Sequence, residues 1–471
     1  MDEPMCSGKL TDENIRKIFE GAGDFIRRPL QCGKWTLYAY AIDGLTSGGD
    51  ASDYVIKPIT QQLTADSMPN LYTAALNGMI YNCVADPCKD LNTVALKLVN
   101  GFCVVLFPNV GAIAFEVKTG EKRGIASPDL ENTAKGPKDA FVETVRTNTS
   151  LIRRHLRTPD LRLYETQVGR SSLTNVSIVW INGITSPKLV QRMKQRLETM
   201  EVEGLLSPAS VQECVTGSRA TAFPLLQYTE RTDTFCQGLL EGRVGLFVDG
   251  LPLGYLAPVD VGYLMTSAED YGRDYISASC VRVLRYFALL ISLLLPALYI
   301  AFTVHHSALL PETLWGVIQD SKSEAPFSAI WEVLGLLVAF ELLQESGVHL
   351  PQSIGQSVSI IGGIVVGTAG AEAGLISSVA LIMVSIAGVC GFVLPNRDFA
   401  AAIRVWRFVL AVLAATIGVF GIVIGLLFLL LRLARLQSLG VCYLVCNEPG
   451  ILRKREKAHT RENRPLEGQE K

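Results

Sequence analysis

Charge is what this chain has least of. Asp, Glu, Lys and Arg make up 19% of its 471 residues, whereas an ordinary soluble protein carries about 25%. The shortage is concentrated, because only 12 charged residues lie among the 146 residues from Tyr286 to Leu431. A charged, water-soluble body joined to such a charge-poor block excludes a purely soluble enzyme.

Histidine, paired cysteine and short catalytic motifs are also scarce. There are five histidines, and the 11 cysteines include only two close pairs, Cys83/Cys88 and Cys442/Cys446, with no second pair or histidine nearby. A zinc site is therefore poorly supported, and the odd count fits reduced thiols. Because GxGxxG, P-loop and GxSxG motifs are all missing, we expect no cofactor, no metal and no enzymatic activity.

The charge balance and the N-terminus narrow the class further. The net charge of −2 provides no basic field that would attract nucleic acid. The first thirty residues contain no apolar run, so we expect no cleaved signal peptide. We therefore expect the soluble body to lie in the cytosol.

Four uncharged apolar runs approach the roughly 20 residues that a membrane-spanning helix needs. They cover residues 287–304, 350–371, 373–396 and 408–431. One such run alone could be a buried core helix, but four in succession favour an all-α, multi-pass membrane domain. We assign this domain to residues 276–436 and a basic cytosolic tail to residues 437–471.

The arginines that flank these runs predict the topology. Arg282 and Arg285 precede the first run, and Arg432 and Arg435 follow the last. Both ends of the domain should then lie in the cytosol, with an even number of crossings between them. Four spans satisfy this rule, but they leave three arginines on the outer side against it: Arg397, Arg404 and Arg407.

Segment 326–345 is apolar but carries three glutamates. At 100° per residue, Glu341 and Glu345 share a face, whereas Glu332 lies on the opposite one. A carboxylate facing lipid is costly, so this amphipathic segment either lies at the membrane surface or lines an aqueous path, and the sequence leaves both open. These glutamates and Glu372 are our candidate pore or vestibule residues, with Glu341 and Glu345 the first choice.

Two pairs of glycines with a spacing of four lie in a stretch rich in small residues. They are Gly363 with Gly367, and Gly370 with Gly374. Small residues at this spacing let transmembrane helices approach closely. We expect these glycines to pack helices together, either within one chain or between the chains of a homo-oligomer.

The first 275 residues alternate helix-like and strand-like stretches, and they predict two α/β subdomains, 1–131 and 132–275. In the first, we expect helices over 11–28 and 51–63 and strands over 35–42, 102–107 and 112–117. In the second, we expect helices over 137–156 and 187–200 and strands over 174–182 and 243–249.

Two polar clusters of the second subdomain have competing interpretations. Arg153, Arg154 and Arg157 lie close together on a helix and could bind an anion, but a solvated or salt-bridged helix face is more common for such a run. The sequence TERTD (229–233) precedes a short helix. We interpret both clusters as structural.

Ordered stretches along the chain are similar to those of one family. They include GPKDAFVETVRTNTSLIRRHL (136–156), VGRSSLTNVSIVWINGI (168–184), LLEGRVGLFVDGLP (239–252) and LPQSIGQSVSIIGGIVVG (350–367). In this order they resemble the GerA family of spore germination proteins, which comprises A subunits of nutrient germinant receptors and SpoVAF-type relatives. The resemblance runs from about residue 35 to residue 447.

The resemblance implies a multi-pass protein of the spore inner membrane whose N-terminal region and tail are cytosolic. It also implies a transporter-like B subunit and a lipoprotein C subunit as partners. Our leading hypothesis is a receptor A subunit that converts nutrient sensing by its partner into ion release through a homo-oligomeric channel. The alternatives are a non-conducting scaffold subunit and a SpoVAF-type amplifying channel; a secondary transporter is weaker, because no internal repeat is visible.

Overall fold

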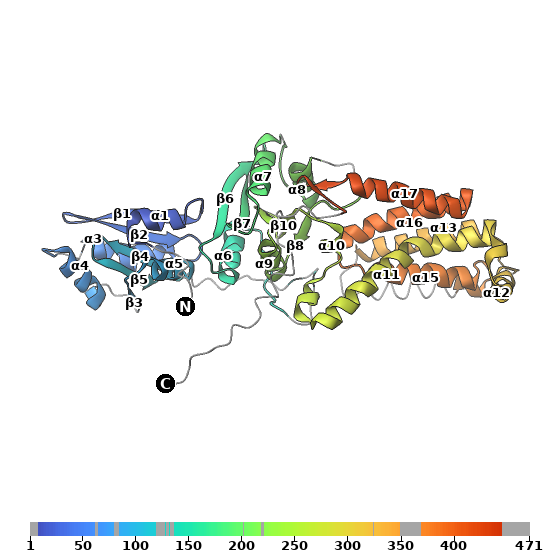
Figure 1. Cartoon of the computed structure of the whole chain (residues 1–471), viewed down its shortest axis with the longest axis horizontal. Helices are drawn as coiled ribbons and strands as arrows, with labels where there is room; N and C mark the ends of the chain where they lie inside the picture. Colours follow the sequence, from blue (N-terminus) through green and yellow to red (C-terminus); the bar gives the residue numbers. More distant parts are fainter. Residues whose placement is uncertain are drawn as a thin grey trace, which may run out of the picture.

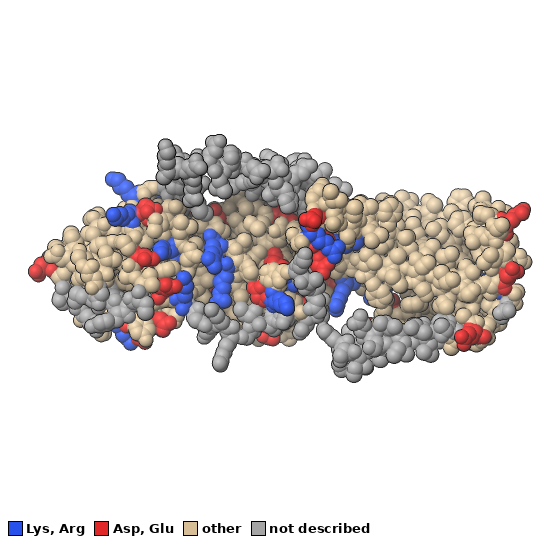
Figure 2. Space-filling view, turned by 90° about the horizontal axis from the view of Figure 1, so that it is seen from below, with Lys and Arg blue, Asp and Glu red and all other residues tan. Residues whose placement is uncertain are grey.

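The chain forms two α/β subdomains and a helical bundle, which follow one another along the long axis of the molecule (Figure 1). The structure is a computed structural model that describes residues 8–61, 65–79, 84–118, 128, 131, 136–200, 202–217, 221–323, 325–348 and 369–444. Charged side chains are spread over the two subdomains, whereas the bundle surface is almost bare of them (Figure 2). The expected order, an α/β region followed by a helical part, is confirmed.

The first subdomain is an antiparallel sheet with helices on both faces. Its strands are β1 (Phe25–Cys32), β2 (Trp35–Ile42), β3 (Ala85–Cys88), β4 (Phe102–Phe107) and β5 (Gly111–Glu116), in the order β1-β2-β4-β5-β3. Its helices are α1 (Asp12–Ile18), α2 (Gly48–Ala51), η1 (Ser52–Ile56), α3 (Lys57–Gln61), α4 (Met68–Ala74), η2 (Ala75–Met79) and α5 (Leu91–Val99). The segment from α2 to η2 packs on one face of the sheet, and α1 and α5 pack on the other.

The sequence predicted the centre of this sheet better than its edge. The strands expected over 35–42 and 102–107 are confirmed as β2 and β4, and β4 is buried along its whole length, as a continuous apolar run indicates. The helix expected over 11–28 is too long. It ends at Ile18, and Phe25–Cys32 forms an edge strand, where Pro29 is tolerated.

The second subdomain repeats this architecture. Its strands are β6 (Leu161–Val168), β7 (Thr174–Ile181), β8 (Gln227–Thr229), β9 (Val244–Val248) and β10 (Gly254–Ala257), in the antiparallel order β6-β7-β9-β10-β8. Its helices are α6 (Val145–His155), α7 (Pro187–Thr199), α8 (Pro208–Thr216), α9 (Thr232–Leu240), α10 (Val261–Leu264) and η3 (Ala268–Gly272). Helices α6 and α9 cover one face of the sheet, and α7 and α8 cover the other.

The helix expected over 137–156 is shorter than its sequence suggests. It begins at Val145, because the side chain of Asn148 bonds the N–H and the carbonyl of Val142 at 2.8 and 2.6 Å and holds the preceding residues in a loop. Local bonds of this kind compete with helix formation. The strands and the helix expected over 174–182, 243–249 and 187–200 are confirmed to within one residue at each end.

A buried ion pair joins the two subdomains. Arg153 on α6 donates from Nε and Nη2 to the two carboxylate oxygens of Asp24, both at 2.8 Å, and both side chains are almost fully buried. The N–H of Gly23 also donates to the carbonyl of Leu163 at 2.8 Å. The arginine cluster on this helix is therefore salt-bridged at Arg153, which favours the structural interpretation over the anion site.

The bundle consists of α11 (Tyr275–Ile300), η4 (Ala301–His305), η5 (Ser307–Leu309), α12 (Glu312–Ser323), α13 (Ala329–Val348), α15 (Ser378–Phe392), α16 (Arg397–Ile417) and α17 (Val419–Arg435). Helices α11, α13, α15 and α16 pack on one another, and α17 packs on α16. Two of the described helical segments, Tyr275–His305 and Arg397–Ile417, are long and apolar enough to cross a membrane.

The apolar run 408–431 is not the single helix that the sequence suggested. It breaks at Gly418 into α16 and α17, which lie side by side as a helical hairpin (Figure 1). Gly418 has a φ of +68°, and a Cβ there would lie 2.7 Å from Cε1 of His306, so the turn requires glycine.

Both open ends of this hairpin lie against the second subdomain, and this position differs from the arrangement that a count of four spans requires. Asn396, the N-cap of α16, donates from Nδ2 to Oε1 of Gln227 at 2.7 Å. Arg397, the first residue of α16, is therefore at the end of the bundle that faces the soluble body, not at the opposite end as a count of four spans requires. Arg404 and Arg407 lie seven and ten residues further along the helix.

Two further expectations fall partly outside the described residues. Gly363, Gly367 and most of the run 350–371 lie there. Gly374 is described and has a φ of +65°, in a turn that follows the helical residues 369–372. It ends a helical turn instead of lining a helix face, and the next helix, α15, begins at Ser378.

The Arg153–Asp24 pair gives the first testable prediction. Arg153→Met leaves Asp24 buried without its cation, which should lower the free energy of unfolding by about 3–5 kcal/mol. Thermal unfolding and limited proteolysis of the full chain in detergent measure this loss. Arg154→Met is the matched control on the same helix. Equal stability of the two variants would show that the buried pair does not hold the subdomains together.

Candidate functional site

The polar contacts between the soluble body and the bundle form a candidate functional site, which we call the junction. Its first element is Asp270 in η3, whose side chain is fully buried. Arg285 of α11 donates to both oxygens of this carboxylate, at 2.6 and 2.9 Å, and also to the carbonyl of Met265. Burial alone raises the pKa of Asp270, but the bonds from Arg285 and from the N–H of Ser267 outweigh it and hold the pKa below its usual value.

The second element of the junction is a β-hairpin that follows α17, formed by β11 (Gln437–Ser438) and β12 (Val441–Cys442). Oγ of the buried Ser438 donates to the carbonyl of Leu225 at 2.6 Å and accepts from the N–H of Val259 at 2.9 Å. The N–H of Val261 donates to the carbonyl of Tyr443. The first residues of the segment that we expected to be a basic cytosolic tail are thus docked into the second subdomain.

The third element is the short strand β8, which contacts the bundle. Gln227 accepts the bond from Asn396, and the hydroxyl of Tyr228 donates to Oδ1 of Asp398 at 3.3 Å. Both bundle residues belong to the first turn of α16 or its cap. The start of α16 is therefore fixed by side chains from β8.

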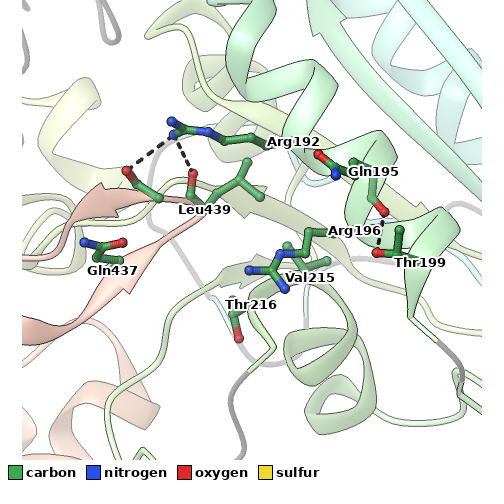
Figure 3. Close-up of a pocket in the computed structure, with 9 residues that line it drawn as sticks. Arg192, Gln195, Arg196, Thr199, Val215, Thr216, Gln437 and Leu439 are labelled. Atoms are coloured by element: carbon green, nitrogen blue, oxygen red, sulfur yellow. Dashed lines mark hydrogen bonds between the residues drawn. The ribbon is translucent and has the colours of Figure 1, made fainter.

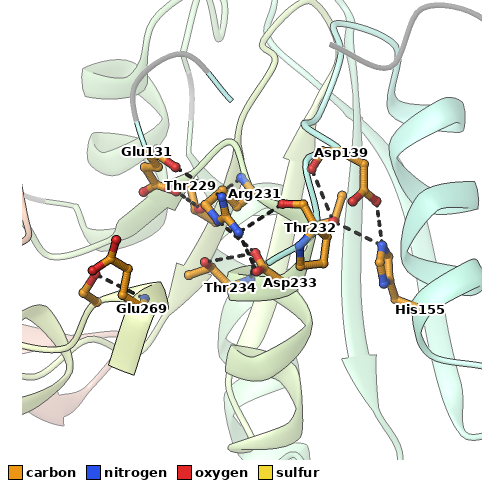
Figure 4. A network of polar contacts seen from close by, with 11 residues as sticks. Glu131, Asp139, His155, Thr229, Arg231, Thr232, Asp233, Thr234 and Glu269 are labelled. Carbon is orange, nitrogen blue, oxygen red and sulfur yellow. Dashed lines mark hydrogen bonds and ion pairs between the residues drawn. The ribbon is translucent and has the colours of Figure 1, made fainter. Parts of the chain in front are cut away.

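The other end of β8 belongs to a polar network around Arg231 (Figure 4). Arg231 is almost fully buried and donates to both oxygens of Asp233, at 3.0 and 2.7 Å, and to the carbonyl oxygens of Glu131 and Pro137. Thr229 donates to the carboxylate of Glu131. The cluster TERTD thus ties the chain between the two subdomains to β8, in agreement with the structural role that we expected.

Two further pairs complete this network. Nε2 of His155 lies 2.6 Å from Oδ2 of Asp139 and 3.2 Å from Oγ1 of Thr232. Burial of Asp139 alone raises its pKa, but bonds from His155 and Thr232 lower it overall. Burial raises the pKa of Glu131 to about 7, partly offset by the bond from Thr229. Among the described residues, no group of three His, Cys, Asp or Glu side chains could hold a metal ion.

The candidate pore carboxylates lie in different surroundings. Oε1 of Glu341 is 3.2 Å from Nε of Arg404, and Arg404 also donates to Gln344 one turn further along α13. The buried Arg407 follows on the same helix as Arg404. Sequence spacing alone could not pair these groups, because α13 and α16 are far apart in the chain.

The remaining carboxylates differ in their burial. Glu332 is 3% exposed inside the bundle, and neither of its oxygens has a hydrogen-bond partner among the described residues. Glu345 and Glu372 are exposed on the bundle surface. The different burial of Glu332 and Glu345 agrees with the opposite helix faces expected from their spacing.

Comparison with known proteins identifies the family. A model of the Bacillus/Clostridium GerA spore germination protein matches residues 13–466. The chain belongs to the GerA family. This assignment confirms the resemblance seen in the sequence and covers nearly the whole chain.

Relatives of this GerA family chain include proteins of Bacillus subtilis (strain 168). Spore germination protein KA is 34% identical over 445 residues, which are 93% of this chain and 79% of that protein. The uncharacterized membrane protein YfkQ is 34% identical over 434 residues, 92% of this chain and 84% of that protein. A crystal structure of the N-terminal domain of the A subunit of the Bacillus megaterium spore germinant receptor GerK3 aligns at 24% identity with a TM-score of 0.42, covering 54% of this chain and 97% of that one.

The docked hairpin gives a second prediction. Ser438→Ala removes one side chain that satisfies both a buried N–H and a buried carbonyl. The free energy of docking of the hairpin on the second subdomain should therefore weaken by about 1–3 kcal/mol. Hydrogen exchange of residues 437–442 should accelerate correspondingly. Ser323→Ala, which removes an exposed serine of α12, serves as the control. Unchanged exchange in Ser438→Ala would mean that other contacts hold the hairpin.

Glu131 gives a third prediction. Its folded pKa of about 7 lies above the usual 4.5, so the folded protein binds this proton more tightly than the unfolded chain. The stabilisation is complete below pH 4.5 and is lost as the pH rises to about 7, by up to about 3 kcal/mol. The stability of wild type relative to Glu131→Gln should therefore fall across this window in thermal unfolding. Glu312→Gln should show no such trend; parallel curves for wild type and Glu131→Gln would contradict the prediction.

Proposed function

We propose that this chain is the A subunit of a germinant receptor, which converts nutrient sensing by a partner subunit into ion release through a homo-oligomeric channel in the spore inner membrane. The partners would be a transporter-like B subunit and a lipoprotein C subunit. The observation that carries this proposal is the attachment of both open ends of the α16–α17 hairpin to the second subdomain. A displacement of that subdomain would act on both helices.

The positions of the arginines support a membrane placement of the bundle. Arg285 near the start of α11, Arg397 at the start of α16 and Arg435 at the end of α17 all lie at the end of the bundle that faces the soluble body. Cytosolic flanks of membrane helices are enriched in Lys and Arg. On this proposal the soluble body and the open ends of the hairpin share the cytosolic side, and Arg285, Arg397 and Arg435 agree with this enrichment.

The charged cluster of α13 and α16 supports an ionic path. Ionisable groups inside a membrane domain are costly and usually mark ion pathways or their partners. Glu341 is 39% exposed at its side chain despite its pairing with Arg404, and Glu345 is exposed one turn further along. Repeated around a symmetry axis, these carboxylates would form rings that favour cations.

Two alternative functions predict different experimental results from those of a receptor A subunit. A non-conducting scaffold subunit would use the same junction to dock partners, and its glutamates would be solvated groups at the membrane surface. A SpoVAF-type amplifying channel would conduct without a transporter-like partner. Co-purification of a transporter-like subunit and a lipoprotein with this chain favours the receptor, and conductance without them favours the amplifying channel.

Charge substitutions in the cluster test the channel and give a fourth prediction. Full-length protein in lipid vesicles that hold a potassium gradient should conduct, and Glu341→Gln with Glu345→Gln should reduce the cation current roughly tenfold, equivalent to about 1.4 kcal/mol of lost attraction. Glu143→Gln, which removes one exposed carboxylate of the soluble body, is the control for charge loss outside the bundle. If neither the wild type nor any variant conducts, the result favours the non-conducting scaffold subunit.

A second pair of variants separates a pore role from a structural one. Glu341→Gln alone leaves Arg404 without its anion, whereas Glu341→Gln with Arg404→Gln removes both charges of the pair. If the carboxylate attracts cations, the double variant folds well but conducts poorly. Full recovery of current in the double variant would show that the pair only supports the packing of α13 on α16.

A further inference from the structure

A pocket of about 470 Å³ opens between the second subdomain and the hairpin that follows α17. Its walls come from α7, α8 and the β11–β12 hairpin (Figure 3). The polar side chains in its lining are Arg192, Gln195, Arg196, Thr199, Thr216 and Gln437. Within the described part of the chain, no carboxylate lines this pocket, so its charge is positive.

Arg192 already holds the hairpin. Its Nη1 donates to the carbonyl oxygens of Leu439 and Gly440, at 3.2 and 3.3 Å. Gly440 has a φ of +76°, and a Cβ there would lie 2.6 Å from this nitrogen. The hairpin is therefore shaped so that the guanidinium of Arg192 can approach its backbone.

Arg196 lies one helical turn further along α7 and has a different environment. Its guanidinium extends toward Thr216 of α8 (Figure 3), and a Cβ on Gly217 would lie 3.0 Å from its Nη1. This guanidinium makes no hydrogen bond or ion pair with any other residue that the structure describes. An unpaired guanidinium thus faces a pocket whose other charged group is Arg192 and whose other side-chain donors include the amides of Gln195 and Gln437.

We propose that this pocket binds a phosphate group. A guanidinium presents paired N–H donors that match phosphate oxygens, and Arg196 offers such a pair. The hydroxyls of Thr199 and Thr216 already donate to the carbonyl oxygens of Gln195 and Gln212, both at 2.7 Å. The side-chain amides of Gln195 and Gln437 can donate to the remaining oxygens. Because the volume exceeds that of inorganic phosphate alone and lies in the usual range of ligand pockets, about 300–1,000 Å³, it leaves room for an organic part attached to the phosphate.

The position of the pocket suggests two sources of this phosphate. Gln437 in the lining is two residues beyond Arg435, which ends α17. If α17 lies in the membrane, a step that rests on the proposed function, the pocket lies near the headgroup layer, which extends roughly 5–8 Å beyond the hydrocarbon on each side. A lipid headgroup or a free cytosolic phosphate compound could then fill it.

Occupation of the pocket would stabilise the junction. A phosphate held by Arg196 and Gln437 would lie beside the hairpin that Arg192 holds, so it would connect α7 with the exit of α17. Any ligand that binds the docked form and not the released form shifts the equilibrium toward docking. The pocket would therefore set how readily α17 separates from the second subdomain.

The first arm of the test uses inorganic phosphate and the full chain in neutral detergent. Phosphate should raise the unfolding temperature and slow hydrogen exchange at residues 437–442, beyond the effect of sodium chloride at equal ionic strength. Arg196→Gln should weaken the apparent phosphate affinity at least tenfold. Arg28→Gln, an exposed change of equal charge in the first subdomain, should leave it unchanged.

The second arm uses vesicles of phosphatidylcholine with and without phosphatidylglycerol. Slower exchange of the hairpin only with phosphatidylglycerol, lost in Arg196→Gln, identifies a lipid headgroup, whereas a response only to inorganic phosphate identifies a soluble ligand. No response in either arm, or an equal response in Arg196→Gln and wild type, overturns the proposal. These readouts do not involve ion current, so a chain that conducts but ignores phosphate refutes the pocket alone, and one that binds phosphate but never conducts refutes the channel alone.

Discussion

The attachment of an apolar bundle to a soluble subdomain at one end is the constraint on which the rest of this structure depends. Bundle helices offer few polar side chains, so their orientation relative to the soluble body is fixed where polar groups are available, at their near ends. Asp270 holds the start of α11, Gln227 holds the cap of α16, and Ser438 is docked just beyond the end of α17. Because α16 and α17 form one hairpin, the second subdomain cannot move away from one of these helices without straining its contacts with the other.

Charge inside the bundle is tolerated where a neighbouring helix supplies a partner. Arg404 and Arg407 are the eighth and eleventh residues of α16, and Glu341 and Gln344 of α13 reach Arg404. A buried charge without a partner costs several kcal/mol, so the packing of α13 on α16 lowers the cost of Arg404. Glu332 differs, because its carboxylate is buried with no hydrogen-bond partner among the described residues.

The sequence predicted the elements whose signal is local. The alternation of WTLYAYAI and the continuous run FCVVLF gave β2 and β4 to the residue, because burial on one or both faces leaves its mark on the strand itself. The prediction of a single helix over 408–431 was wrong at Gly418, because an apolar turn between two apolar helices changes neither the charge nor the mean hydropathy of the run. The sequence also could not pair Arg153 with Asp24 or Glu341 with Arg404, because these contacts depend on how distant elements dock.

Strand β8 shows how a three-residue element can connect the two ends of the molecule. Thr229 bonds the chain between the subdomains, while Gln227 and Tyr228 bond the first turn of α16 or its cap. Three residues of strand span about 10 Å, and pairing with β10 holds β8 in the sheet. A shift of the first subdomain would therefore reach α16 through one short, hydrogen-bonded segment. A flexible linker would absorb the same shift, so the rigidity of β8 is what makes a signal between soluble body and bundle physically possible.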